Sequence, residues 1–208
     1  MKPSLVAAGS LGAFAHYLRD ESINVLESGI DVVVVPTAAA FTGAAHAALE
    51  VASSLEGLDL QLEALMVVDR ASAGEAYFAQ RIGDASLVVL CDGAALHARS
   101  VWRDTLVGEA LAHARRLVGV GAAASVLGEV MIDPRGGAPT TGLGLRAGVA
   151  FSAPASAEQL ARTRTLLGED TALVVLGPRG VLVADDDAWR VVVGDDVVVT
   201  RGSEPTTL

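Results

Sequence analysis

The segment most suggestive of chemistry is residues 115–134, RRLVGVGAAASVLGEVMIDP, where a short β-branched run meets two glycines and an alanine-rich stretch. The pattern predicts a strand, a tight turn at Gly121 and a helix that places apolar residues from Val126 to Met131 on one face. An α/β protein uses such a unit, the nucleophile elbow, to expose a Ser or Cys beside helix N-terminal amides at the carboxyl edge of its sheet. Gly121 has no side chain, so the segment predicts the turn of a catalytic elbow without its nucleophile.

Two other side chains could supply a nucleophile. Ser125 lies one helical turn beyond Gly121, and Cys91 follows the apolar run SLVVL at the sheet edge where such proteins bind ligands. We interpret Ser125 as a small residue that packs its helix against the sheet. The charge of the adjacent Asp92 raises the pKa of the Cys91 thiol and opposes thiolate formation. We therefore expect a buried, unreactive Cys91 and keep a displaced nucleophile as the alternative for both residues.

The other ionisable residues near this edge give no clear acid–base pair. His97, in the segment HARS, could contact a ligand or hold the start of its helix through a hydrogen bond, and both interpretations stay open. Arg103 and Asp104 are predicted to fix a break between two helices. Glu129 follows the elbow and could face the site or a partner subunit.

No metal or cofactor is expected. His16, His46 and His113 lie on predicted helices, and we expect them to lack acidic partners at useful spacing and to be surface or core residues. The acidic runs at residues 185–187 and 195–196 lack the ligand spacing of a calcium loop and are predicted to be solvated turns. A single cysteine excludes a cysteine-rich metal site.

Residues 119–124, GVGAAA, also satisfy the dinucleotide-binding pattern G-x-G-x-x-A between a strand and a helix. The pattern follows the fifth predicted strand rather than the first, and no acidic residue ends a second strand about 20 residues further on. Dinucleotide binding is kept as an alternative.

Positioning these residues requires a regular alternation of strands and helices, which the sequence has. Apolar runs predict strands at residues 5–8, 31–35, 60–68, 86–90 and 117–120. Amphipathic stretches predict helices at residues 14–27, 43–55, 75–81 and 95–113, the last broken near Asp104 and Thr105, where a cap fits. This order predicts an α/β fold with a doubly wound, mostly parallel sheet covered by helices on both faces.

The pattern changes after Pro134. Glycines at residues 136–137 and 142–144 predict a loop, residues 147–151 a strand, and residues 158–167 a helix capped by Ser156. The tail at residues 172–200 alternates apolar runs with turns and predicts a C-terminal antiparallel meander at one edge of the sheet. We find no linker and expect a single domain over residues 1–208.

The composition limits the partners. The 208 residues are 51% apolar but only 4% aromatic, so Ala, Val and Leu must fill the core. A net charge of −10 argues against nucleic acid or an anionic membrane as a partner, and no segment approaches the ~20 apolar residues of a membrane span. The apolar run near the N-terminus is too broken by Gly and Ser to be a secretion signal. One cysteine suits a reducing compartment, so we expect a cytoplasmic protein.

Three segments together resemble the cyanophycinase and dipeptidase E family of serine peptidases. They are PTAAAF at residues 36–41, CDGAALHARSVWRDT at residues 91–105 and GVGAAASVLGEVMIDPRGGAPTTGLGL at residues 119–145. The similarity extends in order from Val6 to Val193, and MIDPRGG with GLGL is its most specific part. The resemblance implies the class I glutamine amidotransferase-like fold, a flavodoxin-like three-layer sandwich, and a homodimer.

The resemblance fails at the residues that would catalyse. The family's nucleophilic serine corresponds to Gly121, and its histidine corresponds to residues 151–154, FSAP, although the last histidine of this chain is His113. The glycine pair that shapes the family's oxyanion region corresponds to Cys91 and Asp92. A serine without a base is a weak nucleophile, and a base without a nucleophile has nothing to activate.

We therefore predict a non-catalytic relative of these peptidases that acts as a structural, partner-binding or self-associating subunit. One alternative is a peptidase- or amidase-like hydrolase that uses Cys91, Ser125 or an unrecognised group. Another is a module that holds a small anionic ligand at helix N-terminal amides. The residues that would line such a site, called the elbow region below, are Gly9, Ser10, Asp92, Gly93, His97, Gly121 and Ala122.

Overall fold

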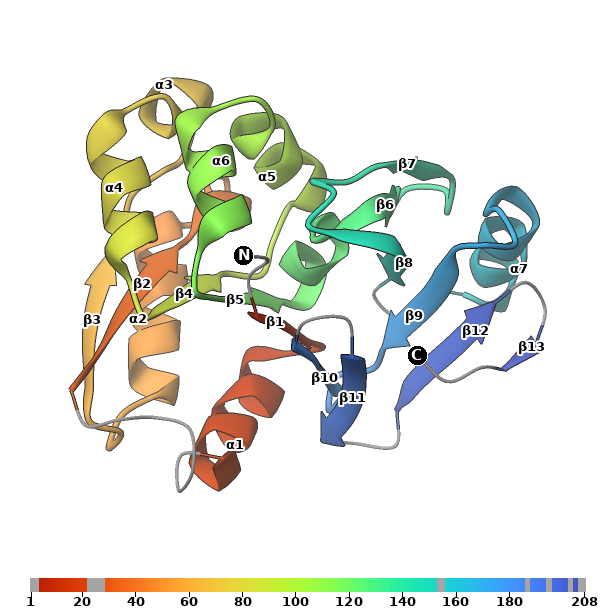
Figure 1. The fold of residues 1–208 in the computed structure, drawn as a ribbon, viewed down its shortest axis with the longest axis horizontal. Helices are drawn as coiled ribbons and strands as arrows, with labels where there is room; N and C mark the ends of the chain where they lie inside the picture. Colours follow the sequence, from red (N-terminus) through yellow and green to blue (C-terminus); the bar gives the residue numbers. More distant parts are fainter. Residues whose placement is uncertain are drawn as a thin grey trace.

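The computed structural model describes residues 4–21, 29–152, 156–185, 188–193, 196–201 and 204–205. Its described strands form two sheets (Figure 1). The first has the order β11-β10-β1-β5-β4-β2-β3, in which the five strands from β1 to β3 are parallel and β10 and β11 are antiparallel to their neighbours. Its strands are β1 (Ser4–Ala8), β2 (Ile30–Val35), β3 (Leu60–Ala64), β4 (Leu87–Leu90), β5 (Arg116–Val120), β10 (Val181–Asp185) and β11 (Ala188–Val193).

Helices cover both faces of this sheet, because successive strand residues point to opposite sides. Val33 and Val35 pack into a core with the helices α4, α5 and α6, whereas Val32 and Val34 pack into a second core with α1 and α2. The first face carries α3 (Arg70–Ala73), α4 (Ala76–Asp84), α5 (Ala95–Trp102) and α6 (Leu106–His113), and the second carries α1 (Leu11–Glu21) and α2 (Ala44–Ser54) (Figure 1). The predicted doubly wound, mostly parallel arrangement is confirmed for this sheet.

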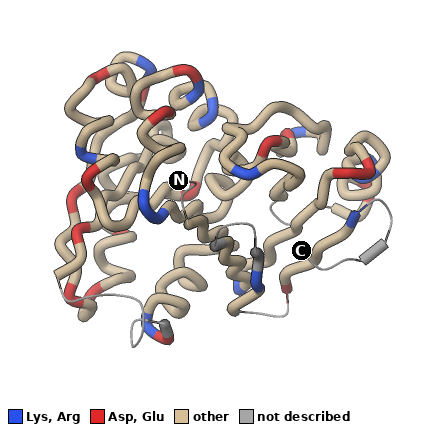
Figure 2. The backbone as a smooth tube through the Cα atoms, viewed as in Figure 1, with Lys and Arg blue, Asp and Glu red and all other residues tan. Residues whose placement is uncertain are grey.

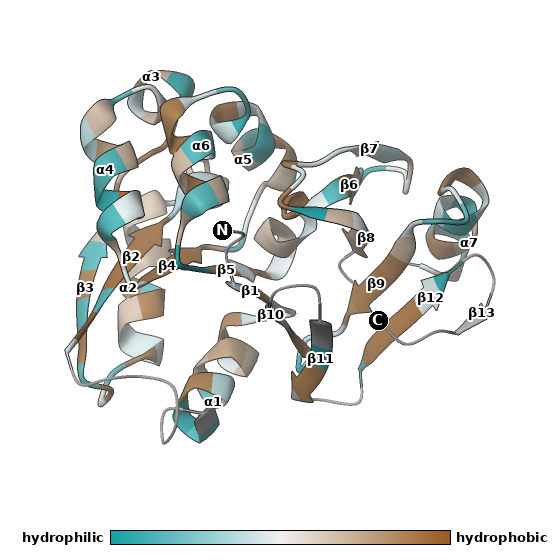
Figure 3. Cartoon of the chain, viewed as in Figure 1, coloured by the Kyte–Doolittle hydropathy of each residue, from teal (hydrophilic) through white to brown (hydrophobic). Residues whose placement is uncertain are grey.

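The second sheet has the order β13-β12-β9-β8-β6-β7. Its strands are β6 (Gly128–Ile132), β7 (Pro139–Thr141), β8 (Arg146–Ser152), β9 (Ala172–Leu176), β12 (Val197–Arg201) and β13 (Glu204–Pro205). The helix α7 (Ala157–Leu166) lies beside this sheet in Figure 1. Phe151 and Val174 of this sheet share one buried core with Leu5 and Val33 of the first, so the two sheets are packed against common side chains. Hydrophobic residues line both sheets in Figure 3.

The helix predicted after Gly121 is wrong in type and in length, because its second half, up to Met131, is a strand. A short 3-10 helix, η2 (Gly121–Val126), follows the turn, and the chain then extends into β6. Met131 packs into the shared core while its neighbour Val130 packs with a small cluster on the other side of the sheet, which is the alternation of a strand. Over so short a segment, adjacent pairs of apolar residues are compatible with the 3.6-residue period of a helix and with the two-residue period of a strand. Backbone pairing with β7 and β8 stabilises the strand.

The predicted C-terminal meander is also wrong, because the tail is divided between the two sheets. The hairpin of β10 and β11 joins the first sheet beside β1, whereas β9 and β12 lie next to each other in the second. β9 moreover pairs in parallel with β8. The turn residues were recognised, but turns alone do not specify which sheet each strand joins.

The helix caps predicted at Thr105 and Ser156 are confirmed. Thr105 Oγ1 accepts a hydrogen bond from the N–H of Gly108 at the start of α6, and Asp104 before it has a φ of +56°. Ser156 and Gln159 form a reciprocal capping box at the start of α7. β3 ends at Ala64, before the predicted residue 68, and the short α3 was not predicted. The predicted end of the first helix, residues 22–27, falls outside the described residues.

Candidate functional site

The elbow forms where β5 ends. Val120 has an extended backbone, and Gly121 turns the chain with a φ of +56°, in the left-handed region that L side chains rarely adopt. The register of the sheet places Ala8 beside Val120, so the turns that follow β1 and β5 lie at the same carboxyl edge. The predicted tight turn is therefore present at the edge where α/β proteins bind ligands.

The carboxylate of Asp92 occupies the space beside this turn. Asp92 Oδ1 accepts hydrogen bonds from the backbone N–H groups of Gly93 and Ala122, each at 2.7 Å. A Cβ atom added to Gly121 would overlap the carboxylate carbon and both carboxylate oxygens of Asp92. A nucleophilic side chain at Gly121 consequently has no room unless Asp92 moves.

The two N–H groups are those that acyl-transfer chemistry at this elbow would require. An oxyanion hole at such a turn combines the N–H of the residue after the nucleophile with one from a neighbouring loop. Ala122 follows the turn residue, and Gly93 lies in the loop between β4 and α5. Because both donors bind Asp92, a developing substrate oxyanion would compete with a carboxylate for them.

The loop that carries this carboxylate is fixed by the 3-10 helix η1 (Thr37–Ala39). Gly93 has a φ of +145°, and a Cβ there would overlap the carbonyl group of Ala38. The N–H of Ala94 donates to the same carbonyl oxygen at 2.7 Å. Thr37 is fully buried, and its hydroxyl accepts a hydrogen bond from Trp102 Nε1 at 3.0 Å. The segment PTAAAF therefore supports the loop rather than supplying a reactive group.

Neither alternative nucleophile lies in the environment of a reactive group. Burial, with smaller effects from the charges of Glu50 and Asp92, raises the pKa of the Cys91 thiol to about 12, so the thiol stays protonated at neutral pH. Ser125 is 6% exposed, and its Oγ donates a hydrogen bond to the carbonyl oxygen of Ala122 at 2.7 Å. The hydroxyl proton of Ser125 is thus directed at the backbone and not at a base.

Ser125 lines a small cavity bounded by η2, β8 and α7. The cavity has a volume of about 100 Å³, and Ser152, the last residue of β8, is another of its lining residues. The resemblance places the family's histidine at residues 151–154, of which 153 and 154 lie outside the described residues. Typical small-molecule sites enclose roughly 300–1,000 Å³, so this cavity is too small for a dipeptide.

His97 has a structural role in this geometry. Its Nε2 lies 2.9 Å from the carbonyl oxygen of Val68 and donates to it, which requires the proton on Nε2. Its ring lies against Phe41, with 4.4 Å between ring centroids. Of the two interpretations left open from the sequence, the hydrogen bond that holds α5 has a direct counterpart in the structure.

The other histidines lie on helix surfaces. The expectation that they lack acidic partners is wrong for two of them, since His16 Nε2 lies 3.0 Å from a carboxylate oxygen of Asp20, and His46 pairs with the residue four positions on at 3.7 Å. His113 Nδ1 contacts the carbonyl oxygen of Glu109 at 2.8 Å. These contacts are within helices and bring no imidazole to the elbow region.

Gly9 and Ser10 lie at the same edge of the sheet, where both make structural contacts with neighbouring segments. A Cβ at Gly9 would overlap the carbonyl group of Gly177. Ser10 Oγ donates to the carbonyl oxygen of Pro178 at 2.6 Å and accepts from the N–H of Ala13 at 3.1 Å, which caps α1. The structure therefore brings Gly9, Ser10, Asp92 and Gly121 to one edge, with His97 held against other segments.

The remaining charged candidates also make structural contacts. Arg103 Nε lies 3.6 Å from Asp104 Oδ2 at the junction of α5 and α6, as interpreted from the sequence. Glu129 Oε2 accepts from the N–H of Gly148 at 3.1 Å, within the second sheet. Asp196 Oδ2 accepts from the N–H of Arg179 at 3.1 Å and holds a turn.

The sequence did not single out Arg70. Its Nη1 donates to the carbonyl oxygens of Ser100 and Arg103, both at 2.8 Å, and so satisfies the C-terminal end of α5. Arg70 is thirty positions earlier in the chain than the first of these, and no local pattern connects them. Only the packing of α3 on α5 makes the contact possible.

The dinucleotide alternative loses its structural basis. The fingerprint needs an α-helix whose N-terminus faces the pyrophosphate, whereas η2 has six residues and leads directly into a strand. The N–H of Ala122 that would face a phosphate binds Asp92 instead.

Among the described residues, no group of three or more His, Cys, Asp or Glu side chains is arranged to hold a metal ion. No helix in the described ranges is both long and apolar enough to cross a membrane. Basic and acidic residues are interspersed along the described chain in Figure 2.

Comparison with solved structures shows a peptidase-like fold. A peptidase from an acI-B1 Actinobacterium superposes with a TM-score of 0.79 at 21% identity, covering 100% of this chain and 94% of its own. A provisionally assigned Peptidase E protein from Listeria monocytogenes EGD-e superposes with a TM-score of 0.63 at 14% identity, covering 96% of this chain and 98% of its own. No family model matches the sequence, and no curated protein matches it. The mixed α/β architecture is therefore peptidase-like.

Proposed function

We propose that this chain is a non-hydrolytic relative of the cyanophycinase and dipeptidase E peptidases, with a class I glutamine amidotransferase-like fold in a single domain. It acts as a self-associating or partner-binding subunit. A peptidase-like fold whose elbow carries glycine supports this proposal. We also propose a cytoplasmic location, because the single cysteine is buried and unpaired.

The observation that carries the proposal is the position of the Asp92 carboxylate. It fills the space of a side chain at Gly121 and accepts both N–H groups that would stabilise an oxyanion. Removing one oxyanion-hole donor from an enzyme costs about 10²–10³ in kcat. Here both donors are occupied by Asp92, the turn residue Gly121 has no side chain, and His97 is hydrogen-bonded to the carbonyl oxygen of Val68. Binding of a small anion at the same amides would likewise require Asp92 to leave.

The test is hydrolysis of a panel of dipeptides with N-terminal aspartate, together with ester and amide reporters, by the purified chain. We expect no turnover by the wild type, by Gly121→Ser, or by the double variant Asp92→Gly/Gly121→Ser, in which the added hydroxyl has space. No described histidine is placed to activate that hydroxyl. Turnover by the wild type that disappears in Ser125→Ala or Cys91→Ala would overturn the proposal and identify the nucleophile.

A further inference from the structure

An unprotected strand edge borders an apolar groove on the first sheet. β3 is the last strand of that sheet, so one side of its backbone has no strand partner among the described residues (Figure 1). Proteins usually protect such edges with proline, a bulge or charges. The sequence of β3 is LQLEA, and its pairing with β2 runs without a register shift. Its single charge, Glu63, is paired with Arg81 of α4.

The groove lies between β3 and α2 and has a volume of about 350 Å³. Leu62 and Met66 are each 38% exposed and Leu49 of α2 is 65% exposed, and all three line the groove. Contiguous exposed apolar side chains beside an open edge are typical of an interaction surface.

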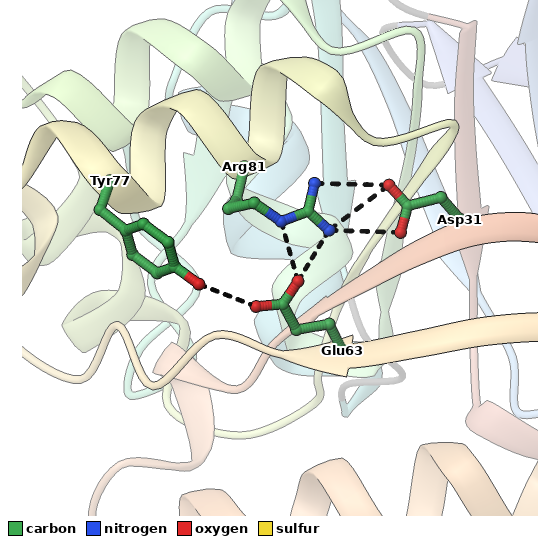
Figure 4. A network of polar contacts seen from close by, with 4 residues as sticks. All are labelled: Asp31, Glu63, Tyr77 and Arg81. Atoms are coloured by element: carbon green, nitrogen blue, oxygen red, sulfur yellow. Dashed lines mark hydrogen bonds and ion pairs between the residues drawn. The ribbon is translucent and has the colours of Figure 1, made fainter.

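The charges on the opposite face of β3 are already paired, as Figure 4 shows. Arg81 Nη2 lies 2.7 Å from Glu63 Oε2 and 3.3 Å from Asp31 Oδ1, and the Tyr77 hydroxyl donates to Glu63 Oε1 at 3.0 Å. These hydrogen bonds lower the pKa of Glu63, with the Arg81 side chain as the first cause. The carboxylate beside the edge is therefore compensated within its own chain.

We propose that the partner for this edge is a second copy of the chain, paired β3 to β3 in antiparallel orientation about a twofold axis at Leu62. The inference rests on the proposed role as a self-associating subunit and names its surface. In this register Leu62 faces Leu62 of the partner, and Leu60 faces Ala64. Gln61 faces Glu63, so an amide can donate to a carboxylate and no like charges are opposed.

Successive side chains of β3 point to opposite faces of the sheet, so the pairing places apolar residues on one face and polar residues on the other. Leu62 and Ala64 line the groove beneath α2, so the twofold axis brings the two grooves together and covers their leucines. Glu63, and by alternation Gln61, lie on the face of α4. A chain with a net charge of −10 repels its own copies. Beside β3 this repulsion is reduced, because Glu63 and Asp31 are both paired with Arg81.

The test combines the mass of the full chain in solution with directed cross-linking. Light scattering at protein concentrations of about 1–100 µM, which brackets dissociation constants in the micromolar range, should give a dimer for the wild type. Leu62→Lys, which opposes two cations across the axis, should shift the midpoint of dissociation upward at least tenfold. Leu166→Lys, at an exposed position on α7, should leave it unchanged. Circular dichroism verifies that both variants are folded.

Leu62→Cys gives an independent readout. Residues directly opposite in an antiparallel pair have Cα atoms about 4.5–5.5 Å apart, within the range for a disulfide. We expect a cross-linked dimer upon mild oxidation, and little cross-link with Leu166→Cys; Cys91 is 3% exposed and should not contribute. A monomer at every concentration, a dimer insensitive to Leu62→Lys, or equal cross-linking of the two cysteine variants would each overturn the proposal. None of these results bears on hydrolysis, which the substrate panel tests separately.

Discussion

A carboxylate at a position where two backbone N–H groups converge is the most informative residue-level feature of this protein. Asp92 follows a buried strand, and its side chain folds back over Gly121 to accept hydrogen bonds from Gly93 and Ala122. The arrangement satisfies donors that would otherwise need water or a substrate. Glycine at residue 121 and aspartate at residue 92 are therefore explained together, since a side chain at the first would overlap the second.

The thiol next to this carboxylate predicts a specific pH dependence. Burial raises the pKa of Cys91 from 9.0 to about 12, so the folded chain retains the thiol proton in a range where the unfolded chain loses it. The stability that this provides is complete below pH 9 and is lost as the pH rises toward 12. We expect the free energy of unfolding, measured in urea between pH 7 and 10.5, to fall more steeply for the wild type than for Cys91→Ala. Parallel curves for the two proteins would contradict the assignment.

Helices and strands that depend on neighbouring residues could be predicted from the sequence, whereas those that depend on distant strands could not. The break between α5 and α6 could be predicted because Thr105 caps a helix through its own neighbours. The segment after Gly121 could not, because Gly128 and Met131 enter a strand only through pairing with β7 and β8. Similarly, nothing near Arg70 in the chain indicates its hydrogen bonds to the end of α5. At the site, the sequence predicted the glycine turn but not that Asp92 would fill it.

The α5–α6 junction gives a matched pair of substitutions at one position. Asp104 has a φ of +56°, where an L-residue costs about 1–2 kcal/mol and glycine is unstrained. Asp104→Gly should leave stability unchanged or raise it, and Asp104→Val should unfold about 1–2 kcal/mol more easily than Asp104→Gly because a β-branched residue tolerates this conformation poorly. Urea denaturation of the two variants measures the difference. Equal stability would show that the junction relaxes out of the left-handed conformation.

For the molecule as a whole, we expect the two sheets to unfold together if the hydrophobic core that they share is continuous. The two sheets are closely packed at Gly119 in β5, where an added Cβ would lie 2.7 Å from Ala124 Cα and 2.8 Å from Leu127 Cδ1. These neighbours belong to the segment that leads into the second sheet. The absence of a side chain at Gly119 thus allows β5 and η2 to approach.

Two glycine substitutions test this packing. Gly119→Ala should lower the free energy of unfolding by about 1–3 kcal/mol, because an inserted methyl group strains a filled core. Gly83→Ala in α4, where an added Cβ meets nothing within 4 Å, should raise it by about 0.5–1 kcal/mol through helix propensity. Thermal unfolding followed by circular dichroism gives both values. A tolerated Gly119→Ala would mean that the two sheets are not tightly joined at this point.

We propose that none of the side chains that the structure describes forms an acyl-enzyme. The most direct test of this proposal is incubation of the folded chain with a serine-reactive fluorophosphonate and, separately, a cysteine-directed electrophile, followed by intact mass spectrometry and peptide mapping. We expect an unmodified mass in the native state, with Cys91 labelled only after unfolding in urea. A stoichiometric adduct on Ser125 or Cys91 of the folded protein would contradict it.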